Sequence, residues 1–323
     1  MLRWLRRLSS GNSEQKANGL AALIAAGAVG ILYLEAPPVP AGADSIRVTA
    51  HRAPTLQKSA PANQALANIV EHAAPISGTP LSPAQQSEAA LRRKIEMLEQ
   101  GRKFLESIPD YTAQFSKQEL VGGELTEEQA IFLKCRHQPF SLYLKWLSGD
   151  VGREVLYVDG RHDGDMIVHA GGWKARLPAL SISPNSPLAL GESRYPVTNA
   201  GLLPLIKTIL AAHAHDATKD SIKHCEQLPD EEFDNRPCAV FVVEYKNAQL
   251  SPVYRKSVVL IDKEWNVPLY TRNFGWPDGA ASQTESELDD ATLIEFYTYT
   301  DVQFRQQLAE VDFDRTNEEY RFR

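Results

Sequence analysis

Cysteine is scarce in this sequence, and its placement argues against a structural zinc site. The 323 residues contain three cysteines, and none of them belongs to a CxxC pair. Cys225 and Cys238 bracket a polar stretch that contains proline, and in an oxidising compartment we expect them to form a disulfide that closes it. Cys135 lies among alternating apolar positions, which predicts a buried free thiol. No metal site is expected.

An excess of positive charge is also missing. The formal net charge is -7 and the isoelectric point is near 5.7, with acidic residues spread along the chain. A protein that binds nucleic acid needs a basic face to neutralise phosphates. Nucleic acid is therefore excluded as the main partner.

No catalytic or metal-binding motif is complete. Residues 159–165 superficially resemble a calcium loop, but Ala170 stands where a bidentate Glu is required, so a hairpin turn is expected. Residues 191–195 lack the second glycine of a nucleophile elbow. His213 and His215 are two residues apart on a predicted helix and would point in different directions. We therefore expect a protein that is not an enzyme and has no cofactor.

Long apolar runs are absent except near the N-terminus. Residues 20–34 are uncharged and follow several basic residues, but this run of about 15 is shorter than the roughly 20 needed to cross a bilayer without tilt. Small residues at 41–43 offer a cleavage site. Residues 1–43 are predicted to be a signal peptide or a single membrane anchor. Either one would place the remainder on the periplasmic side of the cell envelope.

The composition then changes twice. Residues 44–81 are rich in Ala, Pro, Ser and Gln without a sustained period, which predicts a disordered linker. Residues 82–323 have the apolar content of a folded domain.

Apolar residues recur at helical spacing in two segments of this domain. They predict helices at 87–107 and at 198–213, the first after a capping box that begins at Ser82 and the second capped by Thr198.

Most of the remaining domain has a period of two, which is typical of β-strands. Leu142, Leu144 and Trp146 alternate with polar or amphipathic residues, as in a sheet with one buried face. The strands predicted in this way are 111–120, 127–137, 140–147, 154–159, 165–169, 239–245, 255–261, 266–271 and 293–300. Many strands with two helices favour an α+β, mainly β fold: a strongly curved, open antiparallel sheet, or half-barrel, with the helices covering its concave face. The last segment, 308–323, reads as polar and turn-like.

Several polar and aromatic residues are candidates for the mouth or lid of a binding site. Glu295 interrupts an apolar strand and is placed either to pair with Arg194 or Arg255 or to contact a ligand. The proline-rich stretch at 177–196 is a long ordered excursion of the kind that often carries function. The candidates are Trp173, Arg194, Tyr195, Trp276, Glu295 and Tyr297. For each of them an ordinary structural role is the alternative; for Trp173 it is packing on the sheet beside a hairpin.

Four segments together resemble one bacterial family. They are DYTAQFSKQE at 110–119, PFSLYLKW at 139–146, GREVLYV at 152–158 and ESRYPVT at 192–198. From about residue 95 onward the chain is similar to the domain of unknown function 1571 (DUF1571), although the stretch at 317–320 has Glu where the family pattern has Pro. The resemblance implies a fold like that of the periplasmic lipoprotein carriers (LolA- and LolB-like), whose hollow holds acyl chains. It implies no reaction.

Two functions follow as hypotheses. The first is an extracytoplasmic, non-catalytic protein that binds a lipid, another apolar ligand or a lipidated protein in the hollow of the sheet. The second is a scaffold or protein-interaction module tethered to the membrane, whose hollow is filled by its own side chains. An apolar cavity of several hundred Å³ would favour the first hypothesis, roughly the size of known ligand pockets.

Overall fold

The computed structural model describes residues 81–277, 279 and 284–322. The predicted signal peptide or anchor at 1–43 and the predicted linker up to residue 80 lie outside these residues. Within the described part of the chain, no helix is both long and apolar enough to cross a membrane.

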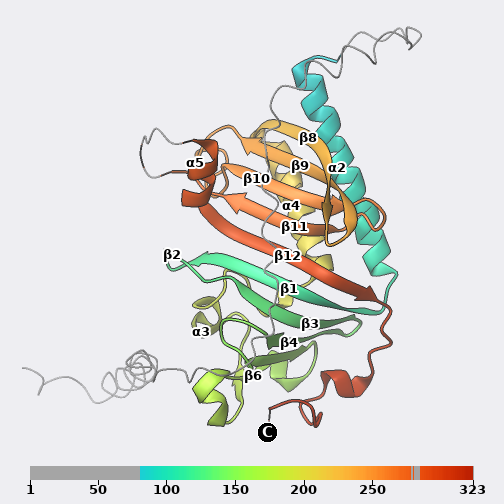
Figure 1. The fold of residues 1–323 in the computed structure, drawn as a ribbon, viewed down its shortest axis with the longest axis vertical. Helices are drawn as coiled ribbons and strands as arrows, with labels where there is room; N and C mark the ends of the chain where they lie inside the picture. The colour runs from blue at the N-terminus through green and yellow to red at the C-terminus, as the bar shows by residue number, and fades with distance from the viewer. Residues whose placement is uncertain (1–80, 278, 280–283, 323) are drawn as a thin grey trace, which may run out of the picture. The chain divides into compact units, whose positions relative to one another are not determined.

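The described residues form one open antiparallel sheet of twelve strands, with helices packed against it (Figure 1). The strand order is β7-β6-β5-β4-β3-β1-β12-β11-β10-β9-β8, and the short β2 pairs with β1. Because the order begins at β7 and ends at β8, the sheet has two free edges and is not closed. The predicted α+β, mainly β fold with an open antiparallel sheet is confirmed. The strands are β1 (Asp110–Val121), β2 (Glu124–Leu125), β3 (Gln129–His137), β4 (Phe140–Trp146), β5 (Glu154–Val158), β6 (Met166–His169), β7 (Leu180–Ile182), β8 (Ile222–Phe233), β9 (Arg236–Tyr245), β10 (Lys256–Asp262), β11 (Pro268–Phe274) and β12 (Leu293–Phe304).

The two faces of the sheet are covered by different parts of the chain. On one face, which we call the helix face, the side chains of Tyr111, Cys135 and Leu142 lie in line across β1, β3 and β4, as the pairing register requires. The predicted burial of Leu142, Leu144 and Trp146 on one face is confirmed. Tyr143 points to the opposite face and is buried as well, because another segment covers that side of β4.

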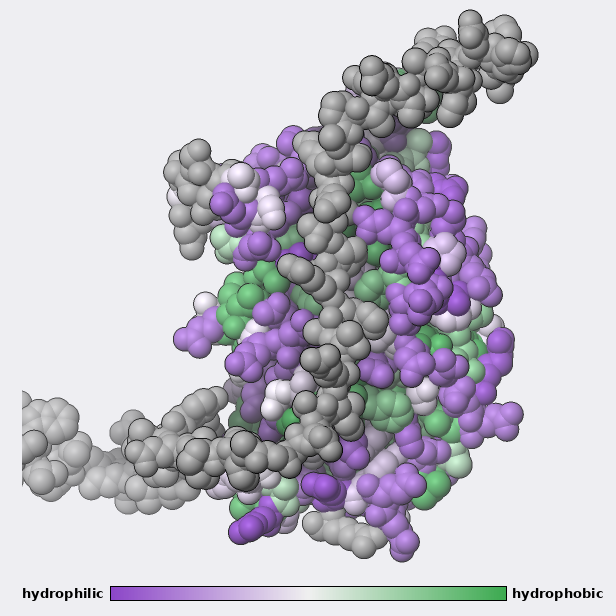
Figure 2. All heavy atoms as spheres, viewed as in Figure 1, coloured by the Kyte–Doolittle hydropathy of each residue, from purple (hydrophilic) through white to green (hydrophobic). Residues whose placement is uncertain are grey.

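Helix α2 (Pro83–Glu106) begins where the capping box predicted. The Ser82 side chain accepts from the Gln85 backbone N–H, and the Gln85 side chain accepts from the Ser82 backbone N–H. Its apolar stripe turns toward the sheet and α4, while hydrophilic side chains line the edge of the molecule where α2 runs (Figures 1 and 2). At Gly101 the helix backbone approaches the β10–β11 turn so closely that a Cβ would lie 2.0 Å from the Asn266 carbonyl oxygen.

Helix α4 (Leu202–Lys219) starts later than predicted. Thr198 lies instead in the 3-10 turn η5 (Val197–Asn199), and the N-cap is Gly201. Two hydroxyls of the sheet satisfy the first backbone donors of the helix: Tyr299 accepts from Gly201 N and Tyr111 accepts from Leu202 N. The start of the helix is therefore set by tertiary contacts, which a local capping rule does not detect.

Strand β8 was not predicted, because its sequence is largely polar and its apolar residues are few. It forms a hairpin with β9 through Asp234 and Asn235, whose φ angles of 53° and 58° match the two-residue turns that favour Asp and Asn. This hairpin overturns the predicted Cys225–Cys238 disulfide, since both thiols are free. Cys225 pairs with Val243 and Cys238 with Glu231, so the two cysteines lie at different levels of the hairpin.

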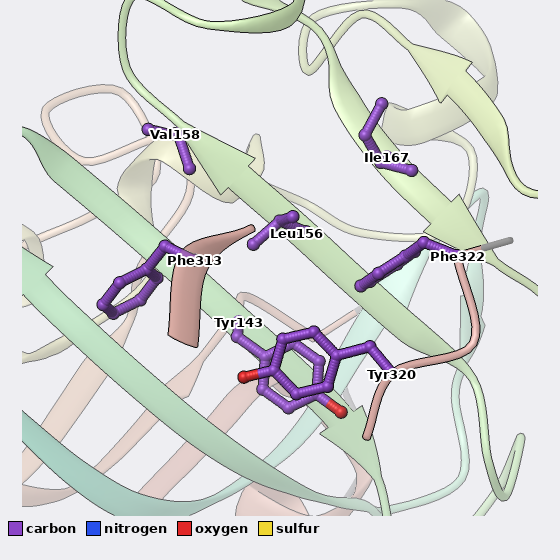
Figure 3. Close-up of a cluster of buried hydrophobic side chains, with 7 residues drawn as sticks. All are labelled: Tyr143, Leu156, Val158, Ile167, Phe313, Tyr320 and Phe322. Atoms are coloured by element: carbon purple, nitrogen blue, oxygen red, sulfur yellow. The ribbon is translucent and has the colours of Figure 1, made fainter. Parts of the chain in front are cut away.

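The C-terminal segment, 308–323, was predicted to be polar and turn-like, but part of it is packed into a core. It crosses the face opposite the helices and includes the 3-10 turn η6 (Glu310–Phe313). Its three aromatic side chains are buried, and Tyr320 stacks on Tyr143 with ring centroids 3.9 Å apart (Figure 3). The cluster comprises Tyr143, Leu156, Val158, Ile167, Phe313, Tyr320 and Phe322. Aromatic residues spaced unevenly among charges show no period, which explains why the sequence did not reveal this packing.

The space between the helices and the sheet is closely filled. Leu98, Leu105 and Ile206 from the helices, and Phe241 from the sheet, have 0% exposure. A side chain with no accessible surface borders no void large enough for a water molecule. A surface depression of about 150 Å³ does lie beside α2, but its lining is mainly polar, with Arg93, Glu96 and Lys263 among its residues.

Candidate functional site

Two buried carboxylates face each other on neighbouring central strands. Glu119 of β1 pairs with Glu295 of β12 in the sheet register, and their residues are 2% and 3% exposed. Like charges directly opposite each other destabilise a sheet, and an unpaired buried charge costs much more. The surrounding donors must therefore compensate both groups.

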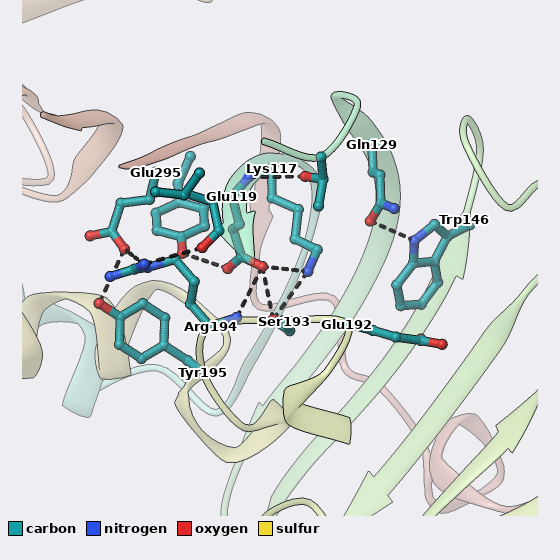
Figure 4. Close-up of polar contacts among 12 residues, drawn as sticks. Lys117, Glu119, Gln129, Trp146, Glu192, Ser193, Arg194, Tyr195 and Glu295 are labelled. Atoms are coloured by element: carbon teal, nitrogen blue, oxygen red, sulfur yellow. Dashed lines mark hydrogen bonds and ion pairs between the residues drawn. The ribbon is translucent and has the colours of Figure 1, made fainter. Parts of the chain in front are cut away.

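Glu119 accepts from four donors (Figure 4). Lys117 Nζ lies 2.8 Å from Oε2, and Tyr297 donates its hydroxyl to Oε1 at 2.6 Å. Ser193 Oγ and the Arg194 backbone N–H donate to Oε2 at 3.0 and 3.3 Å. Burial alone would raise the pKa of Glu119, but the Lys117 ammonium and the hydrogen bonds outweigh it, and the pKa lies below its ordinary value. Glu119 is therefore held as a carboxylate.

Glu295 also accepts hydrogen bonds from four donors. Arg194 Nε donates to Oε2 at 2.9 Å and the Tyr195 hydroxyl to the same oxygen at 3.1 Å. Tyr254 and Asn273 donate to Oε1 at 2.9 and 2.7 Å. Burial and the negative charge of Glu295 raise the pKa of Tyr254, so this phenol remains a donor.

The predicted pairing of Glu295 with Arg194 is confirmed, whereas Arg255 pairs with Asp289. Of the six candidates, the structure brings four together: Arg194, Tyr195, Glu295 and Tyr297. Trp276 donates to the Ser251 carbonyl at 2.8 Å and packs, as Tyr254 does, against the cluster of Cys225, Val243 and Tyr245. Trp173 is 66% exposed and takes no part in this network. The alternative prediction, that Trp173 packs on the sheet, is also wrong, because its side chain is mostly in solvent.

We call this network the carboxylate clamp, and sequence reasoning missed five of its nine residues. The nine are Lys117, Glu119, Ser193, Arg194, Tyr195, Tyr254, Asn273, Glu295 and Tyr297. A signal for Glu119 was present, because Tyr111, Phe115 and Glu119 share one face of a strand by alternation. Each oxygen of the two carboxylates already accepts hydrogen bonds. The clamp therefore holds residues 193–195 against the sheet.

A second polar cluster lies beneath the two helices. Lys94 of α2 is 0% exposed, and its Nζ has no hydrogen-bond partner in the protein. Burial lowers the pKa of Lys94 to about 8, although Cys225 and Asp216 partly oppose the shift.

His213 of α4 is also buried without hydrogen-bond partners for its side chain. Neither of its ring nitrogens makes a hydrogen bond, and Nδ1 stays 3.6 Å from Asp216 Oδ2. Burial and the neighbouring Lys94 lower its pKa to about 4. Asp216 is bonded instead to Ser221 Oγ at 2.7 Å and to the Tyr245 hydroxyl at 3.2 Å. The contact between helices and sheet thus contains buried polar groups without hydrogen-bond partners in the protein.

Among the described residues, no group of three or more His, Cys, Asp or Glu side chains is placed to hold a metal ion. The fold and the clamp define a class of protein with an open antiparallel sheet, a two-helix cover and a polar clamp that fastens a long excursion to the sheet.

The model of the family described as "Protein of unknown function (DUF1571)" matches residues 108–322, and the chain belongs to this family. No curated protein matches the chain.

Several solved structures are similar to it. Lipoprotein LppX of Mycobacterium tuberculosis is 11% identical, with a TM-score of 0.40, covering 69% of this chain and 99% of that one. MucB in the Pseudomonas aeruginosa MucA/MucB complex is 13% identical, with a TM-score of 0.39, covering 69% and 60%. A LolA superfamily protein from Nitrosomonas europaea is 10% identical, with a TM-score of 0.29, covering 68% and 96%.

Proposed function

We propose that this protein is an extracytoplasmic, non-catalytic binder of a lipid or another apolar ligand, including the acyl chains of a lipidated protein. The ligand would lie between the helix face of the sheet and α2, with α2 as a displaceable cover. The described structure is then the closed, ligand-free state. The extracytoplasmic location is supported by the basic and apolar pattern of residues 1–43.

The observation that carries this proposal is that several polar groups buried under the cover have no hydrogen-bond partner. Lys94 Nζ and both ring nitrogens of His213 are buried without hydrogen bonds. Each such group costs about 1 to 3 kcal/mol relative to a solvated or paired one. The closed position of α2 is therefore less stable than its apolar contacts alone would make it, and opening relieves part of that cost.

The contacts of the clamp indicate that α4 stays in place and that α2 is the part of the cover that would move. The excursion that leads into α4 is fastened to the sheet through Glu119 and Glu295, and the start of α4 through Tyr111 and Tyr299. In contrast, α2 is joined to the edge strand by a hydrogen bond from the Cys225 backbone N–H to Ser87 Oγ at 2.8 Å. Displacing α2 would expose Met97, Leu98 and Leu105, which an acyl chain can cover in turn.

A second function has its own supporting observation. The interior is filled at Leu98, Ile206 and Phe241, and the cavity of several hundred Å³ that would favour a permanent ligand site is not found beside these side chains. A scaffold or protein-interaction module that never opens would have this interior. The two functions differ in whether the cover moves, which is open to measurement.

Native mass spectrometry of the full chain, purified from its own cell envelope, tests the proposal. We expect a population carrying an adduct of lipid mass, and titratable binding of a fluorescent fatty acid to the delipidated protein. The variant Lys223→Met, which changes an exposed side chain on β8, should behave like the wild type. A bare protein mass together with no fatty acid binding would leave the interaction module as the better description.

A further inference from the structure

The exposed apolar side chains are concentrated at one end of the sheet. Eleven large hydrophobic residues are exposed in the described part of the chain, and seven of them fall between residues 147 and 190. Six of these seven form what we call the apolar end: Val151, Trp173, Leu177, Leu180, Leu188 and Leu190, each between 39% and 66% exposed. Scattered surface hydrophobics are normal, but a concentration of this kind marks an interaction site.

Specific contacts bring these segments together. Trp173 lies in the 3-10 helix η4 (Gly172–Arg176), and the Gly172 backbone N–H donates to the Val151 carbonyl at 3.0 Å. Two residues after the helix α3 (Pro187–Leu190), Glu192 pairs at 2.5 Å with Arg153 in the turn between β4 and β5. Leu180 belongs to β7, the free edge strand of the sheet.

The charges at this end differ from those of the whole chain. From residue 166 to residue 191 there is no Asp or Glu, although the chain contains 41 acidic residues. Lys174 and Arg176 follow Trp173 on η4, and Arg176 is exposed. The carboxylate of Glu192 is neutralised by Arg153, which leaves the half-buried Asp150 as the acid in the adjoining turn.

We propose that the apolar end is a membrane-docking surface, whose partner is the headgroup region of a bilayer containing anionic lipid. Trp prefers the boundary between water and hydrocarbon, because its ring is apolar and its N–H needs a polar partner. Leu and Val side chains beside it enter the acyl boundary, while Lys174 and Arg176 meet lipid phosphates. A soluble protein partner would have less use for an acid-free stretch in an acidic chain.

The N-terminal sequence is consistent with this partner. If residues 44–81 form the tether that their composition predicts, a coil of that length spans about 35 Å on average, by the scaling for flexible linkers. A domain held at that distance from an anchor stays within reach of the bilayer. Docking needs no opening of the cover, so it stands independently of the proposed ligand binding.

The test uses the full chain in vesicles, and the readout must be local because residues 20–34 would bind the bilayer by themselves. The emission of Trp173 is obtained as the difference between the wild type and Trp173→Phe. We expect this difference spectrum to shift to the blue on vesicles of phosphatidylcholine with phosphatidylglycerol, and to be quenched by brominated acyl chains. Trp265, taken in the same way from Trp265→Phe, should show neither effect.

A charge-reversed variant tests whether Lys174 and Arg176 contribute to docking through lipid phosphates. Lys174→Glu with Arg176→Glu should reduce the equilibrium constant for docking by at least about fivefold for each basic residue replaced, and vesicles of phosphatidylcholine alone should also reduce it. An unshifted and unquenched Trp173 signal in vesicle-bound protein would overturn the proposal. So would a Trp173 shift that depends on protein concentration without lipid, since a second copy of the chain would then be the partner.

Discussion

Glu119 and Glu295 show how two like charges are accommodated at the centre of a sheet. Their donors come from β1, β11, β12, the excursion at 193–195 and the loop that carries Tyr254. The ion pair with Arg194 was predictable, because an acid in an apolar strand needs a partner. The role of Glu119 was not, since it depends on which strand of the sheet lies beside β1.

Arg194→Met tests the clamp. The substitution leaves a carboxylate that is 3% exposed without its cation, and we expect the free energy of unfolding to fall by about 2 to 4 kcal/mol in denaturant titrations. Adding Glu295→Gln should recover part of this loss, because no buried charge then remains unpaired. The control Lys223→Met breaks an exposed pair with Glu244 and should change stability by less than about 0.5 kcal/mol. Equal effects of the Arg194 and Lys223 variants would contradict the clamp.

Lys94→Met tests the unpaired amine. The pKa of Lys94 is lowered to about 8 from its ordinary 10.5, so between these values the unfolded chain holds the proton more tightly than the folded one. The stability of the wild type relative to Lys94→Met should therefore rise with pH from about 8 to 10.5, by up to about 1 kcal/mol per pH unit. Below pH 8 the difference should be constant, with the Met variant the more stable. Taking the difference cancels the titration of the buried tyrosines and cysteines common to both proteins. A flat difference across this pH range would show that Lys94 is not buried as a strained cation.

Among the secondary-structure elements, α2 and β8 illustrate what local sequence rules detect. The capping box at Ser82 and the apolar stripe after it were sufficient to predict α2. Strand β8 escaped because, as an edge strand, it buries few of its side chains, so its alternation is weak. The start of α4 also escaped, because hydroxyls from β1 and β12 cap it.

Gly101→Ala tests how closely α2 lies on the sheet. Its new Cβ would meet the Asn266 carbonyl, so we expect a net loss of about 1 to 3 kcal/mol in spite of the better helix propensity of Ala. Amide exchange should become faster in α2 and stay unchanged in β1 and β12. Gln100→Ala, at the exposed neighbouring position, serves as the matched control and should leave exchange unaffected. Unchanged α2 exchange in the Gly101 variant would mean that the helix is not seated on the β10–β11 turn.

For the molecule as a whole, the period-two pattern predicted the open antiparallel sheet correctly, and the two stretches of helical spacing predicted its helical cover. It could not show whether the hollow is empty, because alternation reports which side chains point inward and not how completely they fill the space. The C-terminal aromatic cluster is a related case. Phe313, Tyr320 and Phe322 pack on the face opposite the helices only after the sheet has formed.

The most direct measurement of ligand binding under a movable cover uses a reversible lock on α2. In Ser87→Cys, the new thiol lies beside Cys225, since the native Ser87 Oγ accepts from the Cys225 backbone N–H at 2.8 Å. Oxidation should join α2 to β8, which mass and thiol titration can verify. Ser87→Cys with Cys225→Ser is the control that cannot lock.

Fluorescent fatty acid binding is then compared in the two redox states. We expect the oxidised Ser87→Cys protein to bind at least about tenfold more weakly than the reduced one, with recovery on adding reductant and no redox effect in the control. Equal binding by the locked and unlocked proteins would contradict a cover that must move to admit its ligand.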